Sequence, residues 1–177
     1  MLARLAPSGP AEREDLWLLR RMAADQPDPW DRGTALHATA SALVVHPPTR
    51  RVLLRWHTRM EGWYQVGGHG DPGETDPAAI TLREAIEETG LPDLAFWPAA
   101  DDPLPVHVVV VNVPEGKGEP PHRHGDLRYV LATAAPDAIR PEHDGADLRW
   151  LTVDEAIAAS QEENLRESLR RAAALMR

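Results

Sequence analysis

Apolar residues recur with a helical period in four segments of the chain. In the first segment, Leu16, Leu19 and Ala23 are spaced so that they share one side of a helix. The last segment carries a similar apolar stripe that ends at Met176. Helices are therefore predicted over residues 11–25, 77–89 and 153–160, and from about residue 162 to the end of the chain.

Shorter apolar runs, bounded by proline, glycine and polar residues, separate these helices and predict strands. They cover residues 36–46, 51–56, 62–68, 106–112, 122–132 and 148–151. We expect residues 62–68 to form one short strand that ends in a glycine pair. The continuous apolar run of residues 106–112 is typical of a strand covered on both faces. The order of strands, one embedded helix, more strands and then helices predicts a single α+β domain.

The composition is that of an ordinary globular protein, with 42% hydrophobic and 27% charged residues among 177. The chain has no cysteine, which excludes disulfides, zinc–thiolate sites and a cysteine nucleophile. A net charge of −9 argues against a protein that coats DNA or RNA. A small anionic substrate remains compatible with this charge, because divalent cations can invert the local charge of a site.

Membrane and secretory signals are missing from the hydrophobic pattern. No apolar run reaches the roughly 18–20 residues of a membrane span. The first residues, MLARLAPSGPAERED, meet prolines and acids too early for the apolar core of a signal peptide. We therefore expect a cytoplasmic protein with no membrane partner.

Three glutamates share one side of the helix predicted over residues 77–89. At about 100° per residue, Glu84, Glu87 and Glu88 fall within an arc of roughly 100°. Such like-charge pairs destabilise a helix by about 0.2–0.5 kcal/mol each, so a purely structural helix gains nothing from them. Hard cations such as Mg²⁺ and Mn²⁺ take oxygen ligands, usually together with substrate phosphates. The pattern indicates a metal site, and we expect the opposite side to face the core with Ala78, Leu82, Ala85 and Ile86.

The stretch around this helix, residues 67–91, reads GGHGDPGETDPAAITLREAIEETGL. It resembles the Nudix signature, in which a glycine, five residues, a glutamate and seven residues precede Arg-Glu-apolar-x-Glu-Glu-x-Gly-apolar. The matching residues are Gly68, Glu74, Arg83, Glu84, Ala85, Glu87, Glu88, Gly90 and Leu91. Eight residues, not seven, separate Glu74 from Arg83. We expect the extra residue in the loop at 75–77, so that the helical part keeps its register.

The resemblance implies a Nudix-type α/β/α sandwich, with a mixed β-sheet between helices, over residues 34–177. Residues 1–33 would be an N-terminal helical extension. It also implies a hydrolase that depends on Mg²⁺, or on Mn²⁺ in its place, and cleaves a diphosphate linkage. The substrate would be a small phosphorylated metabolite: a nucleoside diphosphate linked to another moiety, or a nucleoside triphosphate. A homodimer is compatible with the resemblance.

The same resemblance implies roles for individual residues. Glu84, Glu87, Glu88 and the carbonyl of Gly68 would be metal ligands, and Arg83 would orient the carboxylates. Arg83 and the three glutamates would thus form the catalytic set. The base stays open between Glu84 and an acid of a later loop, for which the accessory candidates are Glu142 and Asp144.

A second candidate feature is a polar stripe on the strand predicted over residues 122–132. Alternate residues of a strand share a face, so His122, His124, Asp126 and Arg128 point the same way. We expect this stripe and His69, which follows the glycine pair, to bind the substrate rather than to form a dedicated histidine metal site. The alternative is the solvated side of a sheet.

Other functions on the same fold are weaker interpretations. A non-catalytic nucleotide sensor would have lost signature glutamates, whereas all three helical ones are present. Isopentenyl-diphosphate isomerases commonly use a cysteine, which this chain lacks. Messenger-RNA cap hydrolysis needs a basic RNA path, and no cluster of lysine and arginine indicates one.

Overall fold

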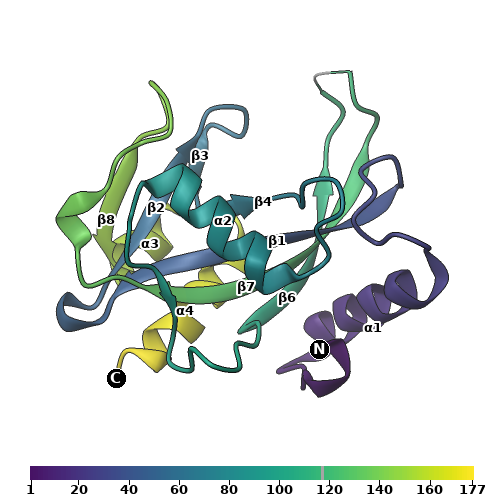
Figure 1. Ribbon diagram of the computed structural model, residues 1–177, viewed down its shortest axis with the longest axis horizontal. Helices are drawn as coiled ribbons and strands as arrows, with labels where there is room; N and C mark the ends of the chain where they lie inside the picture. Colours follow the sequence, from purple (N-terminus) through teal and green to yellow (C-terminus); the bar gives the residue numbers. More distant parts are fainter. Residues whose placement is uncertain (117) are drawn as a thin grey trace.

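The computed structural model describes residues 1–116 and 118–177 and is built around an eight-stranded mixed sheet (Figure 1). The central strands β1 and β7 run parallel over ten paired residues, and the other pairings are antiparallel. The path β3-β2-β1-β7-β5 is extended by β4 on β1, β6 on β7 and β8 on β2. The strands are β1 (Leu36–His46), β2 (Arg51–His57), β3 (Gly62–Tyr64), β4 (Val66–Gly68), β5 (Ala95–Phe96), β6 (His107–Val113), β7 (His122–Ala132) and β8 (Leu148–Thr152).

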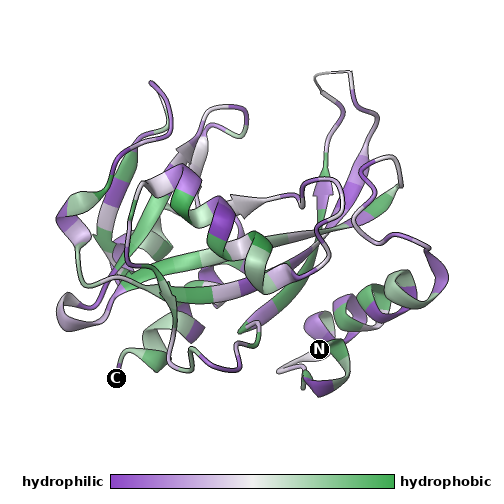
Figure 2. Cartoon of the chain, in the orientation of Figure 1, coloured by the Kyte–Doolittle hydropathy of each residue, from purple (hydrophilic) through white to green (hydrophobic). Residues whose placement is uncertain are grey.

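Helices cover both faces of this sheet and complete the predicted sandwich. Helices α1 (Pro10–Asp25) and α2 (Pro77–Thr89) pack on one face, whereas α3 (Val153–Ala159) and α4 (Glu163–Leu175) pack on the other. Strand β1 serves both layers, because Ala42 and Val44 face α2 while Leu43 and Val45 face α4. Figure 2 shows hydrophobic residues gathered in the strands and hydrophilic residues in the loops. Short 3₁₀ helices lie ahead of α1, at Leu2–Arg4, and in the connections at Pro47–Thr49 and Pro136–Ala138.

Helix α2 begins and ends as local sequence chemistry dictates. The side chain of Asp76 caps its N-terminus by accepting a hydrogen bond from the Ala78 amide, and Pro77 occupies the first turn. Gly90 ends the helix in a left-handed conformation with φ 65°. Helix α2 therefore occupies the predicted residues, and the placement of the inserted residue in the loop at 75–77 stays a prediction.

Helix α1 is packed into the same core as the rest of the chain. Leu16, Leu19 and Met22 contact apolar residues of β6 and β7. Gly125 of β7 permits this approach, because a Cβ atom there would lie 3.0 Å from the Leu19 side chain. The buried carboxylate of Glu12 also accepts hydrogen bonds from Arg171 of α4. We retain as a proposal that residues 1–33 are an extension added to a domain over residues 34–177.

Three sequence-based expectations need correction, and one strand was missed. Residues 62–68 form two strands instead of one, since β3 pairs with β2 and β4 pairs with β1. Strand β5, which pairs with β7, was not predicted, because its two residues are too few to show a periodic pattern. Strand β6 is fully buried only in its first half, over residues 107–109. Ile86 is 42% exposed, because the buried side of α2 is centred near Glu88, about 160° away around the helix.

Candidate active site

Strand β4 runs beside α2 and brings two carboxylates against the glycine pair. The backbone N–H of Gly67 donates a hydrogen bond of 2.8 Å to Glu88. A Cβ atom at position 68 would lie 2.7 Å from a carboxylate oxygen of Glu84, so a larger residue there would displace that carboxylate. Gly67 has φ +133°, and a Cβ atom there would approach the Ser41 backbone to 2.4 Å. The glycines therefore allow helix, strand and carboxylates to come close together.

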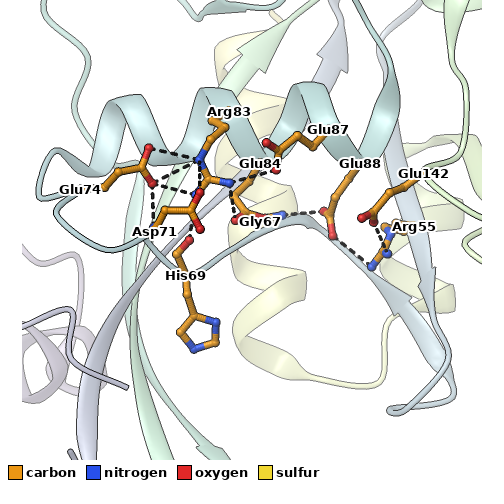
Figure 3. A network of polar contacts seen from close by, with 10 residues as sticks. All are labelled: Arg55, Gly67, His69, Asp71, Glu74, Arg83, Glu84, Glu87, Glu88 and Glu142. Atoms are coloured by element: carbon orange, nitrogen blue, oxygen red, sulfur yellow. Dashed lines mark hydrogen bonds and ion pairs between the residues drawn. The ribbon is translucent and has the colours of Figure 1, made fainter. Parts of the chain in front are cut away.

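Arg83 is the centre of a polar network at the N-terminal half of α2 (Figure 3). Its guanidinium donates to Glu74 at 2.8 Å and to Glu84 and Glu87 at 2.9 Å. It also donates to the backbone carbonyl of His69 at 3.0 Å. The inserted residue therefore does not separate Glu74 from Arg83. This network holds the Glu84 carboxylate beside the glycine pair, as expected for an orienting arginine.

Glu88 is the most deeply buried of the three helical glutamates. Its carboxylate forms an ion pair of 3.1 Å with Arg55, which also donates to Glu142 at 3.2 Å. Burial raises the pKa of Glu88 to about 7, and the nearby charges of Glu84 and Glu142 add to that increase. The Arg55 charge and the Gly67 amide oppose it. Burial likewise raises the pKa of Glu84, whereas Glu87 is exposed.

This donor set fits a hard divalent cation. Carboxylates of Glu84 and Glu88 lie at one glycine pair, with Glu87 next to them on the helix. All of these donors are oxygens, which Mg²⁺ and Mn²⁺ prefer. The space that a Cβ atom at Gly68 would fill keeps the backbone open to the Glu84 carboxylate. The expected metal ligands are thus brought together by α2 and β4.

The two loop acids that the sequence left as candidates differ in their contacts with the site. Glu142 reaches the site through Arg55, and Figure 3 shows it beside Glu88. Asp144 is exposed, and its backbone carbonyl accepts a hydrogen bond from the ring of His143. Arg55 itself was missed from the sequence. The signal was a charged residue within the apolar run of residues 52–56.

A cavity of about 320 Å³ opens on the opposite side of β4 and meets the site at Gly67, Gly68 and His69. Among the described residues, its lining includes the predicted polar stripe of β7 but not the glutamates of α2. Apolar, hydroxyl, amide and charged side chains complete the wall, among them Met60 and Tyr64. The glycine pair therefore lies between the carboxylates and the cavity.

The inner end of the polar stripe is buried rather than solvated. Asp126 and Arg128 are 4% and 3% exposed and form an ion pair of 2.8 Å. Asp126 also accepts hydrogen bonds from Thr39 and Ser41 of β1. The guanidinium of Arg128 donates in addition to Asn164 of α4. These bonds form the floor of the cavity and tie β1, β7 and α4 together.

The outer end of the stripe carries a group of histidines. His122 and His124 lie with His69, and His37 of β1 joins them. Burial lowers the pKa of His69 to about 3 and that of His124 to about 4, and neighbouring histidines add to both decreases. Burial also lowers the pKa of His37. His37 had no role readable from sequence, because only the parallel register of β1 and β7 places it opposite His124.

Comparison with known proteins adds a family to this geometry. Residues 35–173 match the family model described as the NUDIX domain. No match was found among curated proteins. Within the part of the chain that the structure describes, no helix is both long and apolar enough to cross a membrane.

Solved structures with the same fold include several hydrolases. A NUDIX-family hydrolase from Clostridium perfringens is 25% identical with a TM-score of 0.63, over 80% of this chain and 98% of that one. The E. coli dihydroneopterin triphosphate pyrophosphohydrolase is 17% identical with a TM-score of 0.57, over 76% and 92% of the two chains. A C. elegans Ap4A hydrolase is 22% identical with a TM-score of 0.56, over 77% and 95%.

Proposed function

Because this chain belongs to the NUDIX domain family and is a Nudix hydrolase, we propose that it cleaves a diphosphate linkage in a nucleotide and uses Mg²⁺ as its cofactor. The substrate is either a nucleoside diphosphate linked to another moiety or a nucleoside triphosphate. One observation carries this proposal. The Glu84 and Glu88 carboxylates converge on a glycine pair whose other side borders a cavity.

Glu84, Glu87 and Glu88, with the carbonyl of Gly68, are the groups proposed to hold the cation. Bound Mg²⁺ lowers the pKa of a coordinated water and neutralises charge on phosphoryl oxygens. Arg83 keeps the Glu84 carboxylate in place through its bonds to Glu74 and the His69 carbonyl. These contacts orient the carboxylates before any substrate arrives, which reduces the reorganisation needed during the reaction.

Arg55 and Glu142 extend the site beyond the signature. Arg55 offsets the negative charge of the buried Glu88 and also contacts Glu142. Both loop acids are exposed, but Glu142 contacts Arg55 next to Glu88, so we assign the accessory acid to Glu142. A carboxylate here accepts a proton from a water at the edge of the site, as a general base does. Glu84, whose pKa burial raises, is the alternative base.

The cavity supports a small substrate. Its volume of about 320 Å³ falls within the usual range for ligand pockets, and its walls combine apolar and polar side chains. The residues of the lining that we propose to bind the substrate are His69, His122, His124, Asp126 and Arg128. A polymer of nucleic acid is disfavoured by the net charge of −9. A homodimer and a cytoplasmic location remain predictions, which light scattering and cell fractionation would test.

The test is product release by the purified full chain with Mg²⁺ across a panel of phosphorylated compounds. The panel contains nucleoside triphosphates, oxidised nucleotides, ADP-ribose, NADH, nucleotide sugars, dinucleoside polyphosphates and isopentenyl diphosphate. We expect hydrolysis of one nucleotide class that chelation abolishes. Glu88→Gln should lower kcat by about 10²-fold or more, since it removes a charged ligand.

Glu14→Gln is the matched control, because Glu14 is an exposed glutamate of α1 outside the site. It should leave the rate unchanged. Nucleotide binding without turnover by the folded wild type would overturn catalysis in favour of a sensor. Full activity of Glu88→Gln would overturn the metal assignment.

A further inference from the structure

Four histidines from three separate segments meet at the rim of the cavity. His37 lies on β1, His122 and His124 lie on β7, and His69 follows β4. The parallel register places His37 directly opposite His124. Five of the ring pairs have centroids between 4.8 and 5.2 Å apart. Figure 3 shows the ring of His69 turned away from the carboxylates of α2, so this histidine cluster is a separate site.

Ring nitrogens approach one another in pairs within the cluster, and the rings of His37 and His122 are also stacked. The Nε2 atoms of His37 and His69 are 3.1 Å apart, and so are those of His122 and His124. Two imidazoles bound to one tetrahedral ion at about 2.0–2.1 Å place their nitrogens about 3.3 Å apart. One ligand atom from each of His37, His122 and His124 lies within 4.8 Å of the others. His69 lies outside this group of three, but its Nε2 contacts that of His37, so rotation of the His69 ring would add a fourth nitrogen.

Backbone carbonyls orient two of the rings for this purpose. Nδ1 of His37 lies 3.1 Å from the carbonyl of Thr34, and Nδ1 of His122 lies 2.9 Å from that of Pro120. A carbonyl oxygen can only accept, so the hydrogen of each ring is on Nδ1. The Nε2 lone pairs then point into the cluster. Metal-binding histidines are generally held by this kind of bond on the outer nitrogen.

The cluster can also be reached from solvent. It lies between the cavity of about 320 Å³ and a second one of about 220 Å³. His69 and His122 line both cavities. An ion therefore has an entry path that does not pass the carboxylates of α2.

We propose that His37, His69, His122 and His124 bind one transition-metal ion of the Zn²⁺ class. Four imidazole nitrogens suit Zn²⁺, Cu²⁺ or Ni²⁺, whereas the oxygen donors on α2 suit Mg²⁺ or Mn²⁺. The chain thus carries two cation sites of different chemistry on either side of its glycine pair. An ion held by the histidines ties the end of β4 to β1 and β7. The histidine cluster would then contact a substrate through the bound ion and not only through its imidazole rings.

The experiment is a Zn²⁺ titration of the chelator-stripped full chain by calorimetry, in excess Mg²⁺ to occupy the oxygen site. We expect one Zn²⁺ per chain, and with Co²⁺ the absorption bands of a tetrahedral nitrogen-ligated ion. His124→Gln and His122→Gln should each weaken Zn²⁺ binding by at least about tenfold, because each removes an imidazole donor. Both variants keep a polar side chain, which protects the fold better than replacement of the buried His37.

His46→Ala is the matched control, since it removes a histidine from the far end of the same strand as His37. It should leave Zn²⁺ binding unchanged, as should Glu88→Gln. Absence of stoichiometric binding, or equal binding by the folded His124→Gln and His122→Gln variants, would overturn the proposal and leave a hydrogen-bonded histidine group. Because the readout is binding and not turnover, this result is independent of whether the chain hydrolyses a nucleotide.

Discussion

Replacing Glu88 by glutamine should make the metal-free protein more stable while it removes activity. The two side chains have nearly the same shape, and the glutamine oxygen can still accept from the Gly67 amide. What changes is the buried charge. Only 11% of the Glu88 side chain is exposed, so solvent screens it little.

The size and pH dependence of the gain follow from the pKa of Glu88. Burial raises this pKa from 4.5 to about 7, which corresponds to about 3 kcal/mol at 1.36 kcal/mol per pKa unit. The folded state therefore binds the proton more tightly than the unfolded state between these two values. Stability falls as the pH rises through that window, and the full penalty is present above pH 7. The attraction of Arg55 is already included in the raised value.

The assay is thermal and urea unfolding of wild type and Glu88→Gln in a chelator, from pH 4.5 to 8.5. We expect equal stability at the acid end. At the alkaline end the variant should gain about 3 kcal/mol, or about 6–12 °C in Tm for a chain of this length. Added Mg²⁺ should then raise the Tm of the wild type but not of the variant. Glu87→Gln, which changes an exposed carboxylate, is the control for the metal-free measurement and should not show this gain in stability. A variant no more stable than wild type at pH 8.5 would refute the reasoning.

Three further predictions concern the surroundings of the site. Gly67→Ala should destabilise the fold by about 2–4 kcal/mol in urea unfolding, because its Cβ atom would lie 2.4 Å from the backbone of β1 at φ +133°. A loss below about 1 kcal/mol would show that β4 can move away. Arg128→Met should lower the free energy of unfolding at neutral pH by about 3–5 kcal/mol, since it leaves Asp126 charged and buried without its ion partner. An unchanged free energy of unfolding would mean that the β1 hydroxyls and the Gln65 amide satisfy the carboxylate without Arg128. Glu142→Gln should lower kcat by about 10²-fold while Asp144→Asn leaves it unchanged, and the reverse order in steady-state kinetics would move the accessory acid to Asp144.

Much of the fold was predictable because local chemistry determines where its elements begin and end. The bounds of β1 and α2 agree with the expected residues 36–46 and 77–89. Helix α3 starts at the expected residue 153, where Thr152 and Glu155 form a capping box. The predictions that were wrong concern the packing partners of an element, such as the exposure of Ile86 and the division of residues 62–68 into two strands with different partners. That packing depends on partners remote in sequence.

By itself the sequence determined the family signature and the type of chemistry. Oxygen donors at helical spacing, an arginine beside them and a glycine pair are short-range features, and no distant residue is needed to read them. The parallel pairing of β1 with β7 was not readable, because residues 36–45 and 123–132 are far apart along the chain. That register places His37 opposite His124 and lets the hydroxyls of Thr39 and Ser41 donate hydrogen bonds to Asp126. Only the tertiary structure brings Arg55 and Glu142 next to Glu88. The charges that surround a buried carboxylate, and so its pKa, depend on residues that are distant in sequence.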